Sequence, residues 1–211
     1  VHMKTLHTTL LLLLLPALLA AQVTWPALSE DHWREMTTAD LRDLLDNESF
    51  AVDTRSALLS ATALMSAALY NERSGLHRLL LQRGATVDQS NQVGETALMW
   101  AADGNTNPAV LVVLLEAGAE VNRRNDYGET PLMYAARYNS NPEILELLLQ
   151  YSADPTAVSD AGYSVLDYLE LNPHLREYRP QWVVDLERGM PRRDGERERP
   201  EWSPLLRGTA D

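Results

Sequence analysis

The same sequence pattern returns every 34 residues through the middle of this 211-residue chain. Thr62, Thr96, Thr130 and Ser164 open four successive copies, which begin TALMSAA, TALMWAA, TPLMYAA and SVLDYLE. A fixed period of this length is typical of repeat architectures, in which every copy forms one structural unit. One short unit cannot bury its own apolar face, so the copies must stack and share a continuous core. The period therefore predicts a single array of stacked units over most of the chain.

Each copy carries the start signals of two short helices. The hydroxyl of Thr96 suits an N-cap, and Ala101 and Ala102 are small enough for this helix to lie closely against its neighbours. Asn107 and Pro108 are the residue types that start a second helix, with asparagine as the cap and proline at the first helical position. The sequence therefore predicts a helix-turn-helix unit in every copy.

Two serines stand where other copies have glycine. Gly118 lies where a helix must end in the left-handed conformation, and Gly128 suits a tight turn at a hairpin tip. Ser152 takes the first of these positions in the third copy, and Ser60 takes the second position ahead of the first copy. We expect Ser152 either to bear left-handed strain or to end its helix differently, and the first hairpin to be irregular.

The pattern resembles the ankyrin repeat, whose signature is T-P-L-H-x-A followed by a second helix and G-A-D-V-N. The segments Thr130-Pro131-Leu132 and 118–122 (GAEVN) carry the resemblance most closely. The resemblance covers residues 38–172 and implies an all-α ankyrin-repeat solenoid of stacked helix-turn-helix units with hairpin loops. About three full repeats, with partial capping repeats at the ends, fit into this length.

The start of the chain has the features of a secretory signal peptide, which we assign to residues 1–21. Lys4 gives a positive start, residues 10–19 form an apolar core, and Ala20 and Ala21 offer a small-residue cleavage site. This apolar core is about half of the roughly 20 residues that a membrane helix needs. We therefore expect the protein in the bacterial periplasm or secreted, without stable membrane insertion. A retained N-terminal anchor is the alternative.

Two further segments flank the array. Residues 22–37 are expected to form an N-terminal lid or linker, and residues 38–48 the second helix of an incomplete first repeat. The fourth copy has Leu169 and Glu170 where earlier copies have the alanine pair, and these larger side chains prevent another repeat from stacking. Residues 173–211 are therefore expected to form a C-terminal cap and a charged, flexible tail.

The charge balance indicates the class of partner. Residues 38–172 contain 19 acidic residues against eight arginines, whereas residues 173–211 contain eight of each. An acidic array argues against binding to nucleic acid, which needs a basic surface. It is compatible with a partner protein that has a basic surface, or simply with solubility. The chain has no cysteine, so disulfides and thiolate metal sites are excluded.

The sequence contains none of the motifs that carry common chemistry: no Walker loop, no GxSxG elbow and no GxGxxG segment. Its five histidines have no metal-ligand spacing. His77 falls where later copies have Leu111 and Leu145, and we expect a partly exposed structural residue. Glu95 and Glu129 recur once per repeat, as scaffold residues do. We predict no catalytic residues, no metal site and no cofactor; an enzyme with an unfamiliar site is the minor alternative.

The resemblance implies that the function lies in a surface. In ankyrin proteins the hairpin tips and the first helices line a concave face that binds partner proteins. Carried over position by position, this face has the tip residues Gln92, Val93, Glu95, Asp126, Tyr127, Glu129, Asp160 and Tyr163, and the groove residues Tyr70, Asp103, Arg137 and Tyr138. Tyrosines suit an interface, although Tyr70 and Tyr138 have the alternative of covering the turn between helices. Trp100 and Tyr134 are expected to serve packing.

These features together predict an exported, monomeric protein that binds another protein through its concave face and hairpin tips. The resemblance also offers two narrower roles. Some small exported bacterial ankyrin proteins look like immunity factors that inhibit a secreted toxin enzyme, and others are similar to accessory proteins in periplasmic, catalase-linked oxidative-stress defence. Both roles remain open, and the neighbouring genes would separate them.

Overall fold

The computed structural model describes residues 28–47, 52–56, 60–178 and 180–189. The predicted signal peptide, the first part of the predicted lid and the end of the predicted tail lie outside these residues. The chain divides into a first unit that ends at Tyr178 and a second unit that begins at residue 179. In the second unit, the described residues form helix α11 (Gln181–Gly189).

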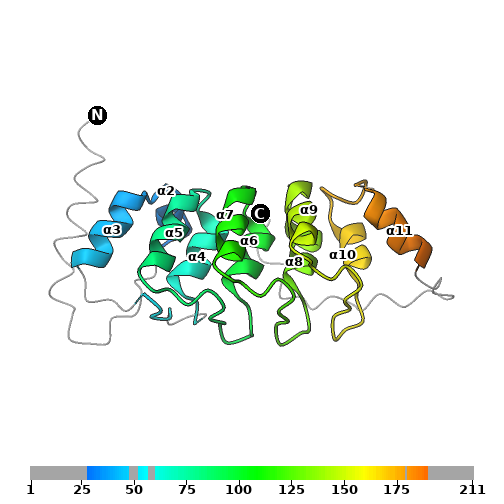
Figure 1. The fold of residues 1–211 in the computed structure, drawn as a ribbon, viewed down its shortest axis with the longest axis horizontal. Helices are drawn as coiled ribbons and strands as arrows, with labels where there is room; N and C mark the ends of the chain where they lie inside the picture. The colour runs from blue at the N-terminus through cyan, green and yellow to red at the C-terminus, as the bar shows by residue number, and fades with distance from the viewer. Residues whose placement is uncertain (1–27, 48–51, 57–59, 179, 190–211) are drawn as a thin grey trace, which may run out of the picture. The chain divides into compact units, whose positions relative to one another are not determined.

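The described helices of the first unit alternate between two rows (Figure 1). Each inner helix packs against the next inner helix, each outer helix packs against the next outer helix, and α4, α6 and α8 pair with the outer helices that follow them. The inner row consists of α2 (Glu30–Glu35), α4 (Ala63–Tyr70), α6 (Ala97–Gly104), α8 (Pro131–Tyr138) and α10 (Val165–Leu171). The outer row consists of α3 (Thr38–Asn47), α5 (Ser74–Gln82), α7 (Pro108–Glu116) and α9 (Pro142–Gln150).

The predicted capping residues begin the helices of the array. Thr96 Oγ1 accepts a hydrogen bond from the Met99 backbone N–H at 3.4 Å, and Thr62 and Thr130 cap α4 and α8 in the same way. Asn107 Oδ1 caps α7 by accepting from the Ala109 N–H at 3.0 Å. Small side chains such as those of Ala101 and Ala102 are fully buried between the inner helices, as expected.

The loops after α5, α7 and α9 project to the same side of the stack and form three fingers, residues 83–96, 117–130 and 151–164 (Figure 1). Neighbouring fingers are joined through their backbones: the Asp126 N–H donates to the Val93 oxygen at 3.1 Å, and the Asp160 N–H donates to the Tyr127 oxygen at 3.0 Å. Among the described residues, β-structure is limited to an isolated bridge within the third finger. The predicted all-α solenoid of stacked helix pairs with hairpin loops is confirmed.

The helix stack begins earlier than the sequence suggested. Helix α2 packs against α4 in the inner row, its Trp33 side chain is buried, and Asn71 Nδ2 donates to the Trp33 oxygen at 2.6 Å. Residues 30–35, within the predicted lid or linker of residues 22–37, therefore occupy the place of an inner helix. Helix α3 is the outer helix that was predicted for the incomplete first repeat.

His77 corrects a second expectation. The side chain is fully buried in α5, where partial exposure was predicted. Its Nδ1 lies 3.2 Å from the Arg73 backbone oxygen, while Nε2 has no hydrogen-bond partner among the described residues. Burial lowers the pKa of His77 below its usual value, and the backbone carbonyls of Arg73 and Ala67 oppose this only in part. The ring is therefore a neutral part of the core.

Both serines at glycine positions adopt the left-handed conformation. Ser152 has φ of 66° and Ser60 has φ of 53°, close to the region that Gly118 occupies with φ of 91°. A side chain with a Cβ atom is strained there, because Cβ crowds the following carbonyl oxygen. The outer helix of the third repeat therefore ends at a strained, left-handed serine. This is the first of the two alternatives expected for Ser152.

Replacing Ser152 by glycine should raise the free energy of unfolding by up to about 1 kcal/mol, because glycine adopts this conformation without a steric penalty. Ser152 is exposed, so the change opens no cavity. Urea unfolding followed by circular dichroism would measure the shift in midpoint. Ser140→Gly is the matched control, since Ser140 is also exposed but has no positive φ. An unchanged or lower midpoint for Ser152→Gly would contradict the prediction.

Candidate functional site

A ladder of four buried asparagines fixes the register of the inner helices. Asn105 Nδ2 donates to the backbone oxygens of Ala68 at 2.8 Å and Asn71 at 3.0 Å, both in the preceding repeat. Asn105 Oδ1 accepts from the Asn107 N–H at 3.0 Å, in the turn that leads to the outer helix. The same bonds recur at the other three members of the ladder, Asn71, Asn139 and Asn172. Each inner helix is thereby tied to the one before it.

Residues that precede these asparagines are consequently aligned across the inner row. Tyr70, Gly104 and Tyr138 occupy one equivalent position, immediately before the asparagines. Asp103 and Arg137 occupy the position one residue earlier. The electrostatic influence of Asp103 reaches the hydroxyls of both Tyr70 and Tyr138. The structure therefore brings together the predicted groove residues, although they come from three separate helices.

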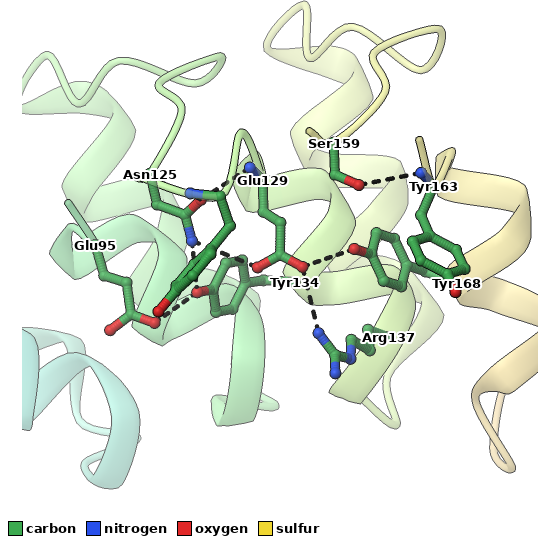
Figure 2. A network of polar contacts seen from close by, with 9 residues as sticks. Glu95, Asn125, Glu129, Tyr134, Arg137, Ser159, Tyr163 and Tyr168 are labelled. Atoms are coloured by element: carbon green, nitrogen blue, oxygen red, sulfur yellow. Dashed lines mark hydrogen bonds and ion pairs between the residues drawn. The ribbon is translucent and has the colours of Figure 1, made fainter. Parts of the chain in front are cut away.

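The recurring glutamates of the first and second fingers form hydrogen bonds within the array (Figure 2). Glu95 Oε2 accepts from Asn91 Nδ2 at 2.8 Å and from Trp100 Nε1 at 2.9 Å, and Glu95 Oε1 accepts from the Tyr134 hydroxyl at 2.5 Å. Tyr134 is buried, and burial together with the Glu95 hydrogen bond holds its pKa far above the usual tyrosine value. Trp100 and Tyr134 therefore combine packing, as predicted, with a hydrogen bond to the same carboxylate.

Glu129 repeats this arrangement one unit further along (Figure 2). Its Oε1 accepts from the Tyr168 hydroxyl at 2.6 Å and from Arg137 Nη1 at 3.3 Å. Asn125 links the two networks, because its Oδ1 accepts from the Glu129 N–H at 2.8 Å while its Nδ2 donates to the Tyr134 hydroxyl at 3.0 Å. The side chains of Arg137 and Glu129 are only 16% and 14% exposed. The carboxylates of Glu95 and Glu129 therefore both have hydrogen-bonding partners within the array itself.

Asp103 differs from these two glutamates. It lies at the end of α6, half-buried, and no described residue donates a hydrogen bond to its carboxylate. Burial raises the pKa of Asp103 to about 6, and the nearby Glu95 carboxylate adds to this effect, while Arg137 opposes it. The array therefore holds a carboxylate whose charge is poorly stabilised by its surroundings.

Asp103→Asn should raise the free energy of unfolding by about 1–2 kcal/mol at about pH 7.5. A carboxyl group with a raised folded-state pKa contributes stability below its unfolded pKa of 3.8, and this contribution is lost as pH rises through about 6. The gain from asparagine should consequently disappear below about pH 4. Urea unfolding at several pH values measures it, with Asp43→Asn on the exposed side of α3 as control. A variant that is no more stable at neutral pH would show that Asp103 is well solvated.

The predicted site residues fall into an exposed group and a half-buried group. Tyr127 at the tip of the second finger is 58% exposed, and Tyr138 at the end of α8 is 43% exposed. The other exposed members are Gln92, Asp126 and Asp160, and the half-buried members are Tyr70, Val93, Glu95, Asp103, Glu129, Arg137 and Tyr163. Asp160 is tied to the neighbouring finger by an ion pair with Arg124 at 3.1 Å. A partner protein would therefore meet mainly the finger tips and the inner-helix ends, and binding by these residues stays a prediction.

A groove of about 690 Å³ lies at the C-terminal ends of α2, α4 and α6. Its lining includes Arg34, Leu69, Tyr70, Arg73 and Gly104. Sequence reasoning missed this groove, because α2 was not recognised as an inner helix. It adjoins the aligned row of Tyr70, Gly104 and Tyr138.

Histidine and acidic side chains do not cluster in the part of the chain that the structure describes. Among those residues, no three histidine or acidic side chains are grouped so that they could hold a metal ion. In the same residues, no helix has both the length and the apolar character needed to cross a bilayer. The described surface offers exposed tyrosines, carboxylates and a groove for contact with another molecule.

Comparison with known proteins identifies the repeat. Residues 64–159 match the family model for ankyrin repeats in three copies. A search of curated proteins gives no match. Ankyrin repeats are generally protein–protein interaction modules and are typically non-enzymatic. The match agrees with the stacked helix pairs and projecting fingers described above, so residues 64–159 consist of ankyrin repeats.

Proposed function

We propose that this protein is an exported binding module that holds a partner protein against its finger tips and inner-helix ends. The observation that carries the proposal is the exposure of Tyr127 and Tyr138 on this face of an ankyrin array. Tyrosines at protein interfaces combine apolar contact area with a hydrogen-bonding end, and few other large apolar side chains of the described chain are as exposed. The acidic balance of residues 38–172 favours a partner with a basic surface.

Capture of the partner tests the binding face. The immobilised protein would be exposed to periplasmic extract, and bound proteins identified by mass spectrometry. The variant Tyr127→Ala/Tyr138→Ala should lose the captured protein, because it removes both exposed rings, and neither tyrosine hydroxyl donates the hydrogen bonds that hold Glu95 and Glu129. Glu129 is left intact, since its carboxylate is bonded to Tyr168 and Arg137 and its loss would disturb the fold.

The matched control is Tyr151→Ala, which removes an exposed tyrosine at the end of the outer helix α9. It should capture the same protein as the unchanged chain, and all variants should keep the same circular dichroism spectrum. Retention of the partner by the double variant would place the binding face elsewhere on the array.

The proposed location rests on the apolar segment at residues 10–19 and is tested separately. Full-length protein would be expressed in a Gram-negative bacterium, fractionated, and its N-terminus sequenced. We expect periplasmic protein that begins at Gln22 and behaves as a monomer in light scattering. Protein found only in the cytoplasm, or still carrying the apolar segment, would overturn this part of the proposal.

Two narrower roles fit such a module: an immunity protein that inhibits a secreted toxin enzyme, and an accessory protein in catalase-linked oxidative-stress defence. An acidic binding face favours inhibition of an enzyme whose active-site surface is basic. A toxin gene beside the coding sequence would support the first role, and a catalase gene would support the second. Each predicts the identity of the captured protein, so the same capture experiment separates them.

A further inference from the structure

His77 is a polar side chain at a position that the other repeats fill with leucine. Leu111 in α7 and Leu145 in α9 are its equivalents, and all three side chains are completely buried. His77 Nδ1 lies 3.2 Å from the Arg73 backbone oxygen, while Nε2 has no hydrogen-bond partner among the described residues. A buried polar atom without a partner lowers stability, so leucine would serve packing better here. The core of the first repeat therefore holds a titratable group that packing does not need.

The surroundings of this ring supply no compensating charge. Helices α3, α4 and α7 pack against α5. The titratable and charged side chains of these four helices, apart from His77 itself, are Asp40, Arg42, Asp43, Asp46, Tyr70, Arg78 and Glu116. Tyr70 is half-buried and the others are exposed to solvent. The groups that favour the protonated ring are two backbone oxygens, those of Arg73 and Ala67, and the effect of burial outweighs them. Protonation would thus place a poorly compensated charge in the core.

The turn that holds the His77 ring also holds helix α2. Arg73 presents its backbone oxygen to His77, while its Nη1 donates to the Arg34 oxygen at 2.9 Å and to the Met36 oxygen at 3.4 Å. Asn71 Nδ2 donates to the same Met36 oxygen at 3.0 Å, and Asn71 Oδ1 accepts from the Arg73 N–H at 2.8 Å. A change that disturbs the start of α5 would therefore also loosen the end of α2.

This end of the array has fewer stabilising features than the central repeats. Helix α5 follows Arg73, which makes no side-chain capping bond, whereas Asn107 and Asn141 cap α7 and α9. An N-cap stabilises a helix by satisfying one of its free N–H groups. Ser60, shortly before α4, has φ of 53° and so bears left-handed strain. Because each repeat contacts only its neighbours, such an end can open while the rest of the array stays folded.

We propose that His77 is an acid-sensitive switch: protonation of its ring opens the N-terminal end of the array, helices α2 to α5, while α6 to α10 stay folded. The switch goes beyond the proposed binding function and needs no partner to operate. It also controls the groove of about 690 Å³, because Arg34, Tyr70 and Arg73 in the groove lining belong to the end that opens. The groove therefore exists only while the His77 ring is neutral.

The direction of the pH dependence follows from burial. Burial lowers the pKa of His77 in the closed array below its usual value of 6.5. Opening exposes the ring, which then binds a proton that the closed core rejects. The stability that the neutral ring allows is fully present above about pH 6.5 and is lost as the pH falls below it. The equilibrium should shift toward the open form by up to about tenfold for each pH unit below 6.5.

Amide hydrogen exchange of the full chain, followed by mass spectrometry, tests the switch. Exchange would be measured at about pH 6.5 and about pH 5.0, and corrected for the intrinsic effect of pH on the exchange reaction. Protection of the amides in α2 to α5 should fall about tenfold between these two values, whereas protection in α6 to α10 should change much less. An unchanged protection of α2 to α5, or an equal loss in α6 to α10, would overturn the proposal.

His77→Leu separates the switch from other effects of acid, since leucine is the residue that the later repeats have at this position. This variant should lose the tenfold fall and keep α2 to α5 protected at about pH 5.0. His174→Leu is the matched control, because it removes an exposed histidine beyond the end of α10 and should retain the fall. A fall of the same size in His77→Leu would assign the opening to another group and overturn the proposal.

The state of the ring in the unchanged chain gives a second test, which does not depend on the folding of any variant. Nitrogen chemical shifts of the His77 ring should show the neutral form with the proton on Nδ1, which can then donate to the Arg73 oxygen. In the closed array, this form should persist at pH values where the ring of a short histidine peptide is already half protonated. Protonation of both rings over the same pH range would show that His77 is solvated, and would overturn the switch.

Discussion

Leu114→Ala should lower the free energy of unfolding by about 2–5 kcal/mol, the range for removing a fully buried leucine from a packed core. Leu114 lies on α7 and has no exposed surface. Helix α7 packs against α6 in its own repeat and against α5 and α9 on either side. The cavity left by alanine would therefore weaken the contacts of the central repeat with both neighbours. Urea unfolding followed by circular dichroism measures the loss.

The effect should also spread along the array, because each repeat contacts only its neighbours. Amide hydrogen exchange in Leu114→Ala should increase first in α5, α7 and α9, and less in α3. Leu171→Ala is the matched control, since Leu171 is 43% exposed at the end of α10 and should lose less than about 1 kcal/mol. A loss at Leu114 as small as that at Leu171 would mean that the outer row is not tightly packed.

The repeat fold was predictable because its determinants are local and periodic. Thr96 and Asn107 cap helices that begin at the next residue, and their bonds reach only two or three residues ahead. Signals of this kind recur in the sequence at the same spacing as the units they build. The left-handed conformation of Ser152 was likewise foreseeable, since the equivalent Gly118 marks where the outer helix must end.

The ends of the array were less predictable because they lack the periodic residues. Helix α2 is identified as an inner helix by the burial of Trp33 and by the hydrogen bond from Asn71, which is 38 residues further along the chain. No threonine-initiated copy of the repeat precedes it in the sequence. The full burial of His77 was missed for the opposite reason: its leucine equivalents in later copies indicated a core position, but its polarity suggested exposure.

The candidate site was predictable in position but not in role. Periodicity placed Glu95, Glu129 and Asp103 on one face, yet it could not show which carboxylates have internal partners. The tyrosines that bind Glu95 and Glu129 each lie 39 residues away, in the following repeat. Such hydrogen bonds depend on how closely successive repeats stack. The sequence of one repeat alone does not show this. The isolation of Asp103 becomes visible only once those neighbours are in place.

Asn105→Ala should have the second large effect, a loss of about 3–5 kcal/mol in the free energy of unfolding. Asn105 is 1% exposed and binds the backbone oxygens of Ala68 and Asn71 as well as the N–H of Asn107. Alanine would leave the two buried oxygens and the partly buried Asn107 N–H without their partner, and each unsatisfied buried group costs about 1–3 kcal/mol before any relaxation. Unlike Leu114→Ala, the Asn105→Ala substitution removes hydrogen bonds between repeats and leaves the apolar core unchanged.

The matched control for Asn105 is Asn141→Ala, which removes an asparagine at the start of α9. The Asn141 side chain caps that helix and donates to the Thr106 oxygen, but both bonds are exposed to water. An N-cap of this kind contributes about 1 kcal/mol, so Asn141→Ala should be clearly milder than Asn105→Ala. Chemical denaturation of both variants measures the difference. Equal losses would mean that water can take the place of the Asn105 side chain as easily as it takes the place of an exposed cap. Burial of the asparagines at the ends of the inner helices would then not be what holds the repeats in register.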